Sequence, residues 1–216
     1  DLDEVAKAGG AAADRQTAVM YMLARYVLTK DFYLNAASSS GISPAYKSYH
    51  EKRASEAQED PKRLILDEFH RTSHSQAVRD QVIVDMREGR KWRVQVALLS
   101  QSLDDFDSVM IDFATSIFIL DAGPEQAIQK SKQVFGLQGS AEDALRNYVR
   151  GPSDQGSTML AQFSTKAGNT TQLITLTLGP IEIWALSTTS EDYLLRNYLY
   201  KRLGPKETRR VLARIF

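Results

Sequence analysis

The chain contains no cysteine, and this absence excludes two classes of site. Without thiols there is neither a disulfide framework nor a thiolate metal site. Long apolar runs are missing too, because no segment approaches the roughly 18–20 apolar residues that a membrane-spanning helix needs. We therefore expect no membrane span. Net charge is also missing: 27 basic residues balance 27 acidic ones, so the whole chain exerts no general attraction on nucleic acid or acidic lipid.

The first residues lack a methionine and a secretory leader, since Asp1-Leu2-Asp3-Glu4 is acidic. We expect the chain to be a piece of a longer protein, and a processed or trimmed chain would look the same. Its 216 residues, 43% of them apolar, are enough for one sizeable globular domain.

Three short apolar runs alternate with helical patterns in the middle of the chain. The runs cover 63–67, 94–99 and 116–120. Such alternation predicts an α/β fold, in which a mainly parallel sheet is flanked by crossover helices and its strands are buried on both faces. Helices are expected around these runs over 15–34, 46–58, 75–87 and 105–113.

The first of these helices, 15–34, has a wide apolar face. This face carries Val19, Met20, Met22, Leu23, Tyr26, Val27 and Leu28.

The C-terminal part contains clear signals for the start and end of helices. Pro124 and Gly136 bound a predicted helix over 124–135, and Ser140, with Asp143 three residues later, resembles a capping box before a helix over 141–149. Three β-like segments fill 158–187, and the third of them is IEIWALS, residues 181–187. A helical hairpin follows, with its arms divided at Gly204-Pro205. We predict two parts: an α/β core over 1–157, and a β segment with a helical hairpin over 158–216, packed on that core.

Two carboxylates end the first apolar run, Leu64-Ile65-Leu66-Asp67-Glu68. A buried strand would deliver them to the carboxyl edge of a parallel sheet, where nucleotides bind. Asp67 would hold Mg²⁺ there, and Glu68 would polarise the water that attacks a γ-phosphate. A strand that ends in a solvated acidic turn gives the same pattern, so both interpretations stay open on this motif alone.

The next strand ends in Ser100-Gln101 and is preceded by Arg90-Lys91. A glutamine at that strand tip can contact both the γ-phosphate and the attacking water. Without a functional role, Gln101 would simply be a polar residue at the end of a strand, and Arg90-Lys91 would lie in a solvated turn. The joint occurrence of both motifs favours a nucleotide site.

These motifs resemble those of a known family. LILDEFH (64–70) followed by MREGRKWRVQVALLSQSLDDF (86–106) is similar to the VirB-four-like type IV secretion and conjugation ATPases, which are HerA/FtsK-type P-loop motors. The opening segment 1–28 and the tail 178–204 resemble the IcmB/DotO and TraU branch of Dot/Icm-like systems.

The resemblance implies a RecA-like ATPase that binds ATP and Mg²⁺. It implies Asp67 as the Mg²⁺ residue, Glu68 as the base and Gln101 as the sensor. Arg90 and Lys91 would lie near a neighbouring subunit's nucleotide, a place for which Arg87 and Arg93 are equally available. It further implies a ring, expected to be a hexamer, on the cytoplasmic face of the inner membrane. Its partners would be other secretion-system ATPases and inner-membrane components.

One departure from the family is plain: no Gly-x-x-x-x-Gly-Lys-Ser/Thr occurs, and Gly9-Gly10 is followed by alanines. Without that loop nothing cradles the α- and β-phosphates. We expect it upstream of Asp1, so that this chain carries the rear half of the site and is inactive alone.

Two alternative functions stay open. The chain could be a non-hydrolysing docking or assembly module of such a complex, or part of a HerA/FtsK-like DNA-translocating motor. The basic C-terminal hairpin, with seven Lys and Arg side chains between 196 and 214, fits nucleic acid, acidic lipid, a subunit contact or a solvated face.

His70 and His74 lie four residues apart and would share a helical face suited to a metal. We do not expect a metal site there, because neither a Glu-x-x-His nor a zincin pattern is present.

Overall fold

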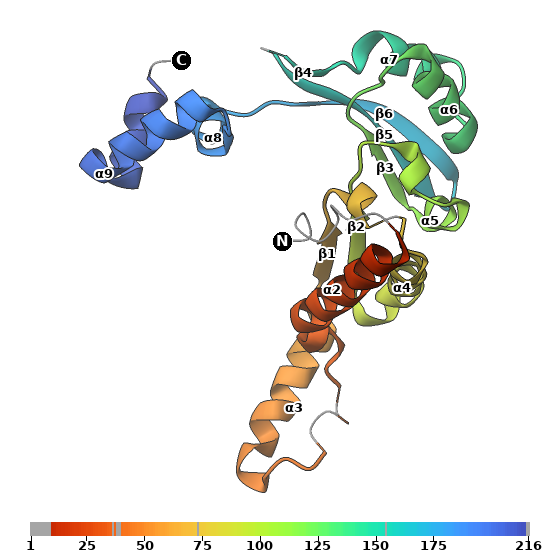
Figure 1. Ribbon diagram of the computed structural model, residues 1–216, viewed down its shortest axis with the longest axis vertical. Coiled ribbons are helices and arrows are strands. Elements are labelled where there is room, and N and C mark those ends of the chain that lie inside the picture. Colours follow the sequence, from red (N-terminus) through yellow and green to blue (C-terminus); the bar gives the residue numbers. More distant parts are fainter. Residues whose placement is uncertain (1–9, 36, 38–39, 73, 154, 215–216) are drawn as a thin grey trace. The chain divides into compact units, whose positions relative to one another are not determined.

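The computed structural model describes residues 10–35, 37, 40–72, 74–153 and 155–214 (Figure 1). The chain forms two compact units that divide between Ala114 and Thr115. The boundary expected at residue 157 falls inside the second unit. No helix in the described ranges is long and apolar enough to cross a bilayer.

Among its described residues the first unit has two strands, with helices before, between and after them in the chain. In chain order its elements are α2 (Ala11–Thr29), η1 (Lys30–Tyr33), α3 (Pro44–Glu59), β1 (Lys62–Leu66), η3 (Phe69–Arg71), α4 (Gln76–Glu88), η4 (Gly89–Trp92), β2 (Val94–Leu98), η5 (Leu103–Asp105) and α5 (Ser108–Phe113). The strands predicted at 63–67 and 94–99 are thereby confirmed within a residue. Strands β1 and β2 pair in parallel, with Leu64 opposite Val96.

The core of this unit lies where α2, α4 and α5 meet the turn after β1. Its buried members are Tyr21, Phe69, Val78, Val82 and Met110. Because α4 connects β1 to β2 and packs on β2, it is the crossover helix that a parallel pair requires.

Helix α2 does not bury the face that its sequence indicates. Its buried side chains are Ala13, Thr17, Tyr21 and Thr29, which repeat every fourth residue or at a multiple of four. Of the predicted apolar face, Val19, Leu23, Tyr26 and Val27 are more than half exposed. Amphipathic spacing therefore identified the helix correctly, while its contacts inside this unit are made by a smaller and more polar stripe.

The second unit combines helices with an antiparallel sheet. Its elements are β3 (Ser116–Ile119), α6 (Glu125–Phe135), α7 (Ser140–Tyr148), β4 (Gly151–Ser153), β5 (Gly156–Thr165), β6 (Gly168–Leu176), α8 (Pro180–Leu186) and α9 (Ser190–Leu212). Strand β5 lies between β3 and β6 and also pairs with β4. A cluster of buried apolar residues, among them Ile128, Leu145 and Leu160, joins α6 and α7 to β5.

The expectation of a mainly parallel sheet is wrong for the described residues. Strand β3 pairs antiparallel with β5, Ile117 lying opposite Gln162, so the parallel pairing is confined to β1 and β2. The physical reason lies in the pairing partner: β3 pairs along β5, a ten-residue strand that also pairs antiparallel with β6. Burial alone does not distinguish the two kinds of strand, because the parallel strand β1 also leaves one face exposed, with Ile65 56% exposed, and the expectation of strands buried on both faces is wrong for it.

The third β-like segment, 181–187, is a helix. Pro180 takes the first helical position of α8, where its fixed φ is favourable and no N–H is needed, and Ile183 N–H donates to the Gly179 carbonyl. The guanidinium of Arg196 donates to the Ser187 carbonyl at 2.9 Å and to that of Ala185 at 3.2 Å, so α9 ties down the C-terminal end of α8. The sequence pattern did not distinguish the two, because a seven-residue segment that is mostly apolar fits either a strand or a helix.

The predicted break in the C-terminal hairpin is confirmed, because Gly204 has non-helical angles, φ 76° and ψ 162°, inside α9. The capping box predicted at Ser140 does not form. The residue that precedes helix α7 is Gly139, and no side chain caps this end.

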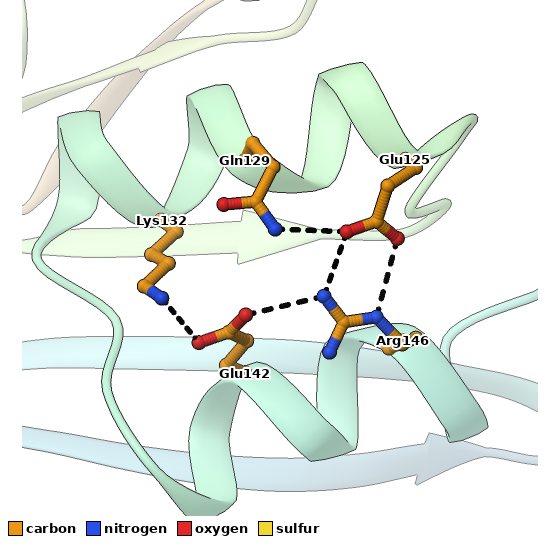
Figure 2. A network of polar contacts seen from close by, with 5 residues as sticks. All are labelled: Glu125, Gln129, Lys132, Glu142 and Arg146. Carbon is orange, nitrogen blue, oxygen red and sulfur yellow. Dashed lines mark hydrogen bonds and ion pairs between the residues drawn. The ribbon is translucent and has the colours of Figure 1, made fainter.

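A network of charged side chains ties α6 to α7 (Figure 2). Arg146 donates to Glu125 at 2.7 and 3.2 Å and to Glu142 at 3.1 Å. Lys132 pairs with the other oxygen of Glu142 at 2.7 Å, and Gln129 donates to Glu125 at 2.8 Å. Two cations and two anions thus alternate across the helix pair.

Candidate functional site

The candidate site lies where β1 and β2 end. Because the strands are parallel, both chains leave the sheet at the same edge. The pairing continues one step beyond the strands: Leu99 N–H donates to the Leu66 carbonyl at 2.9 Å, and Phe69 N–H donates to the Leu99 carbonyl at 2.8 Å. These bonds hold the turn after β1 against the segment that leads to Gln101.

Glu68 has a left-handed backbone, with φ 52° and ψ 44°. This conformation costs a non-glycine residue about 1–2 kcal/mol. Two neighbours hold it: Asp67 Oδ1 accepts the Glu68 N–H at 2.9 Å, and the buried ring of Phe69 stacks on Phe106 with ring centroids 5.9 Å apart. Strained backbone of this kind is concentrated at functional sites.

The side chains of Glu68 and Gln101 meet at this edge. Gln101 Nε2 lies 3.3 Å from Glu68 Oε2 and 3.5 Å from Oε1. Residues 33 positions apart in the chain are thus in contact, as expected for two adjacent parallel strands. An amide donor beside a carboxylate is an arrangement that can position a water or an oxygen of a phosphate.

Asp67 lies next to this pair and is exposed. One of its oxygens is engaged by the Glu68 N–H. A single exposed carboxylate at a strand end fits the usual way in which proteins bind Mg²⁺, through one or two carboxylates together with phosphate oxygens and water. Asp67 is the residue that would hold the ion, which would supply charge neutralisation of the phosphates.

A third side chain at this edge, His70, was not identified from sequence as a neighbour of Glu68. Its Nδ1 lies 3.3 Å from Glu68 Oε2, the same oxygen that Gln101 approaches. The missed signal is the position of His70 two residues after Glu68. Across the left-handed residue and the tight turn that spacing brings the two side chains together, whereas in a helix, the structure expected to follow Glu68, residues two apart do not face each other.

The histidine pair 70 and 74 does not share a helix. His70 lies in η3, whereas His74 precedes α4 and has its Nε2 3.2 Å from Asp14 Oδ1. No group of three or more His, Asp or Glu side chains suited to a metal occurs among the residues that the structure describes.

Arg90 and Lys91 are not brought to this edge. They lie on η4, immediately before β2, at the opposite end of the strand from Gln101. Both are exposed, and Lys91 Nζ lies 5.4 Å from the centre of the Trp92 ring.

The other two arginines that sequence left available are engaged locally. Arg87 stacks over Phe113 at 5.3 Å, and Arg93 Nη1 contacts the Glu59 carbonyl.

Comparison with known proteins adds nothing to this geometry: no family model, no curated protein and no solved structure matches the chain.

Proposed function

We propose that the chain is the rear part of a RecA-like, ATP-hydrolysing motor subunit of the VirB-four-like type that powers a type IV secretion or conjugation machine. The observation that supports it best is the contact between Glu68 and Gln101 at the carboxyl edge of β1 and β2. Glu68 is the base, Gln101 the sensor, and Asp67 the Mg²⁺ residue beside them. ATP is the substrate.

In this mechanism Glu68 accepts a proton from the attacking water. Gln101 directs its amide towards the same water and the γ-phosphate. Asp67 would hold Mg²⁺, and the ion would supply neutralisation of the phosphate charge. The chain's own residues thus supply activation and sensing, whereas the α- and β-phosphates need a glycine-rich loop that this sequence lacks.

The proposed assembly is a ring, which we expect to be a hexamer, at the cytoplasmic face of the inner membrane together with other ATPases and membrane components of the machine. The exposed position of Arg90 at the far end of β2 supports a role in trans. Such an arginine stabilises transition-state charge only across a subunit interface.

The test is steady-state ATP hydrolysis by the protein that contains this chain together with a phosphate-binding loop. Glu68→Gln keeps the shape of the side chain and removes the base, so turnover should fall roughly 10²–10⁴-fold. Affinity for ATP should stay, since Asp67 and the loop hold Mg²⁺ and phosphates. The matched control is Glu51→Gln on α3, where the carboxylate makes only an exposed pair with Lys47 at 3.8 Å. Unchanged turnover in Glu68→Gln would refute the proposal.

The missing phosphate loop also favours a second candidate function, a docking or assembly module that does not hydrolyse ATP. The 216-residue chain by itself should bind ATP poorly and not turn it over under either proposal. The two differ in the longer protein: a motor hydrolyses ATP in a Glu68-dependent way, and a docking module does not.

A further inference from the structure

Two side chains approach one oxygen of Glu68. Gln101 Nε2 donates a hydrogen bond to Oε2 at 3.3 Å, whereas His70 Nδ1, also 3.3 Å from Oε2, lies within ion-pair distance of it without hydrogen-bond geometry. We propose that His70 is a positioning residue that holds the Glu68 carboxylate in the orientation needed to activate water. This inference rests on the proposed function, because it assigns a role only if Glu68 is the base.

The backbone that carries His70 is fixed on both sides. Arg71 N–H donates to the Glu68 carbonyl at 3.0 Å, and Thr72 N–H donates to the Phe69 carbonyl at 3.0 Å. Between them Phe69 is buried to 1% exposure and bonded to Leu99. His70 therefore stands on a rigid turn that is anchored in the core, which is the support that a positioning residue requires.

A contact that is independent of Gln101 would keep the Glu68 carboxylate in place. The side chain of Glu68 is half-buried at the sheet edge and has three rotatable bonds. If Gln101 were its only contact, the Glu68 carboxylate would lose that hydrogen bond whenever the Gln101 amide turned towards a phosphate. The His70 contact with Oε2 does not depend on Gln101. It leaves Oε1, which Gln101 approaches at the longer distance of 3.5 Å, as the oxygen that we assign to the water.

The expected effect follows from geometry. A reacting group displaced by about 1 Å can lose up to 10²-fold in rate. His70→Ala should thus lower kcat about 10- to 100-fold, with KM for ATP changed less than about twofold because His70 would not contact the nucleotide.

The experiment uses the longer protein with its phosphate loop and compares kcat and KM for ATP. His70→Asn should recover part of the loss, because the asparagine amide can reach the place of Nδ1. The matched control is His74→Ala. His74 makes a similarly exposed pair, Nε2 to Asp14 Oδ1 at 3.2 Å, in which Glu68 takes no part, so kcat should not change. The double variant Glu68→Gln/His70→Ala should be no slower than Glu68→Gln alone.

Four outcomes would overturn the inference. The first is a wild-type kcat in His70→Ala together with a lowered kcat in Glu68→Gln. That result would overturn the role of His70 and leave the proposed function intact. Another is a folded His70→Asn, checked by thermal unfolding, that recovers no activity. A third is a rise in KM that accounts for the loss. The fourth is a Glu68→Gln variant as active as wild type, which removes the proposed function and this inference together.

Discussion

Asp85 illustrates how a single residue organises the first unit. Its side chain is 2% exposed and pairs with Arg25, which is 19% exposed. Gln81 donates to the same carboxylate at 3.1 Å. The hydrogen bond to Asp85 raises the pKa of Arg25, and burial, followed by the Asp85 charge, raises the pKa of Tyr21. The pair links α2 to α4, two helices that share a core with Phe69, the residue after Glu68.

Removing one partner of this pair should be costly. Asp85→Ala leaves a guanidinium in a partly buried place without its anion, and should lower the free energy of unfolding by about 3–5 kcal/mol. The matched control is Asp31→Ala, which removes an exposed pair with Arg53 (2.6 Å, side chains 51% and 43% exposed). That change should cost less than about 1 kcal/mol. Urea unfolding of the 216-residue chain measures both, and equal losses would contradict the argument.

Gly89 is a second position where one residue decides local packing. A β-carbon added there would lie 2.5 Å from the carbonyl oxygen of Val94, the first residue of β2. Alanine normally stabilises a helical position by about 0.5–1 kcal/mol relative to glycine. Here the overlap with backbone outweighs that gain, so Gly89→Ala should destabilise the chain by about 1–3 kcal/mol.

The control for this change is Gly179→Ala. The atom that its β-carbon would meet, at 2.8 Å, is Glu182 Oε2, the end of a flexible side chain that can move. Thermal unfolding should show a clear decrease for Gly89→Ala and little for Gly179→Ala. A similar decrease in both would mean that backbone overlap is not the cause.

At the scale of elements, α6 and α7 should respond to acid. The hydrogen bond from Arg146, followed by that from Gln129, lowers the pKa of Glu125 to about 2 (Figure 2). A carboxylate whose folded pKa is depressed stabilises the fold above its unfolded pKa, near 4.5. That contribution is lost as pH falls towards the folded value.

The prediction is a difference in Tm between the wild-type chain and Glu125→Gln that is largest above pH about 4.5 and shrinks between pH about 4.5 and 2. Glu207→Gln, an exposed carboxylate 3.6 Å from Arg210, serves as the comparison and should show no such narrowing. A difference that stays constant over this range would exclude the network as its source.

At the scale of the whole molecule, the proposed ring, together with the exposed position of Arg90, predicts cooperation between subunits. Arg90→Ala should reduce ATP turnover in an assembled ring and leave ATP binding intact. Mixing Arg90→Ala subunits with Glu68→Gln subunits should restore some activity, because an interface then forms between an intact Glu68 and an intact Arg90.

The measurement is ATP hydrolysis across mixing ratios, with ring assembly checked in parallel. If both variants assemble and no ratio exceeds the variants alone, Arg90 is withdrawn as the residue acting in trans. Lys91, Arg87 and Arg93 are then tested in turn.

Much of the candidate site was predictable because it depends on strand order in the chain. Asp67 and Gln101 each follow an apolar run, and a crossover helix between the runs makes the strands parallel and their ends coincide. The place of His70 was not predictable, since it depends on the left-handed angles of Glu68, which are set by Phe69 in the core.

The sequence by itself determined the two parallel strands, the positions of most helices and the absence of any long apolar span, because these follow from periodicity and length. Only the tertiary structure decided that β3 joins the antiparallel sheet, that residues 180–186 are helical and that α2 leaves its most apolar stripe exposed. Each of these depends on which neighbour covers a short apolar segment. A local pattern indicates that such a segment is apolar, whereas the strand or helix that packs against it is determined by residues far away in the chain.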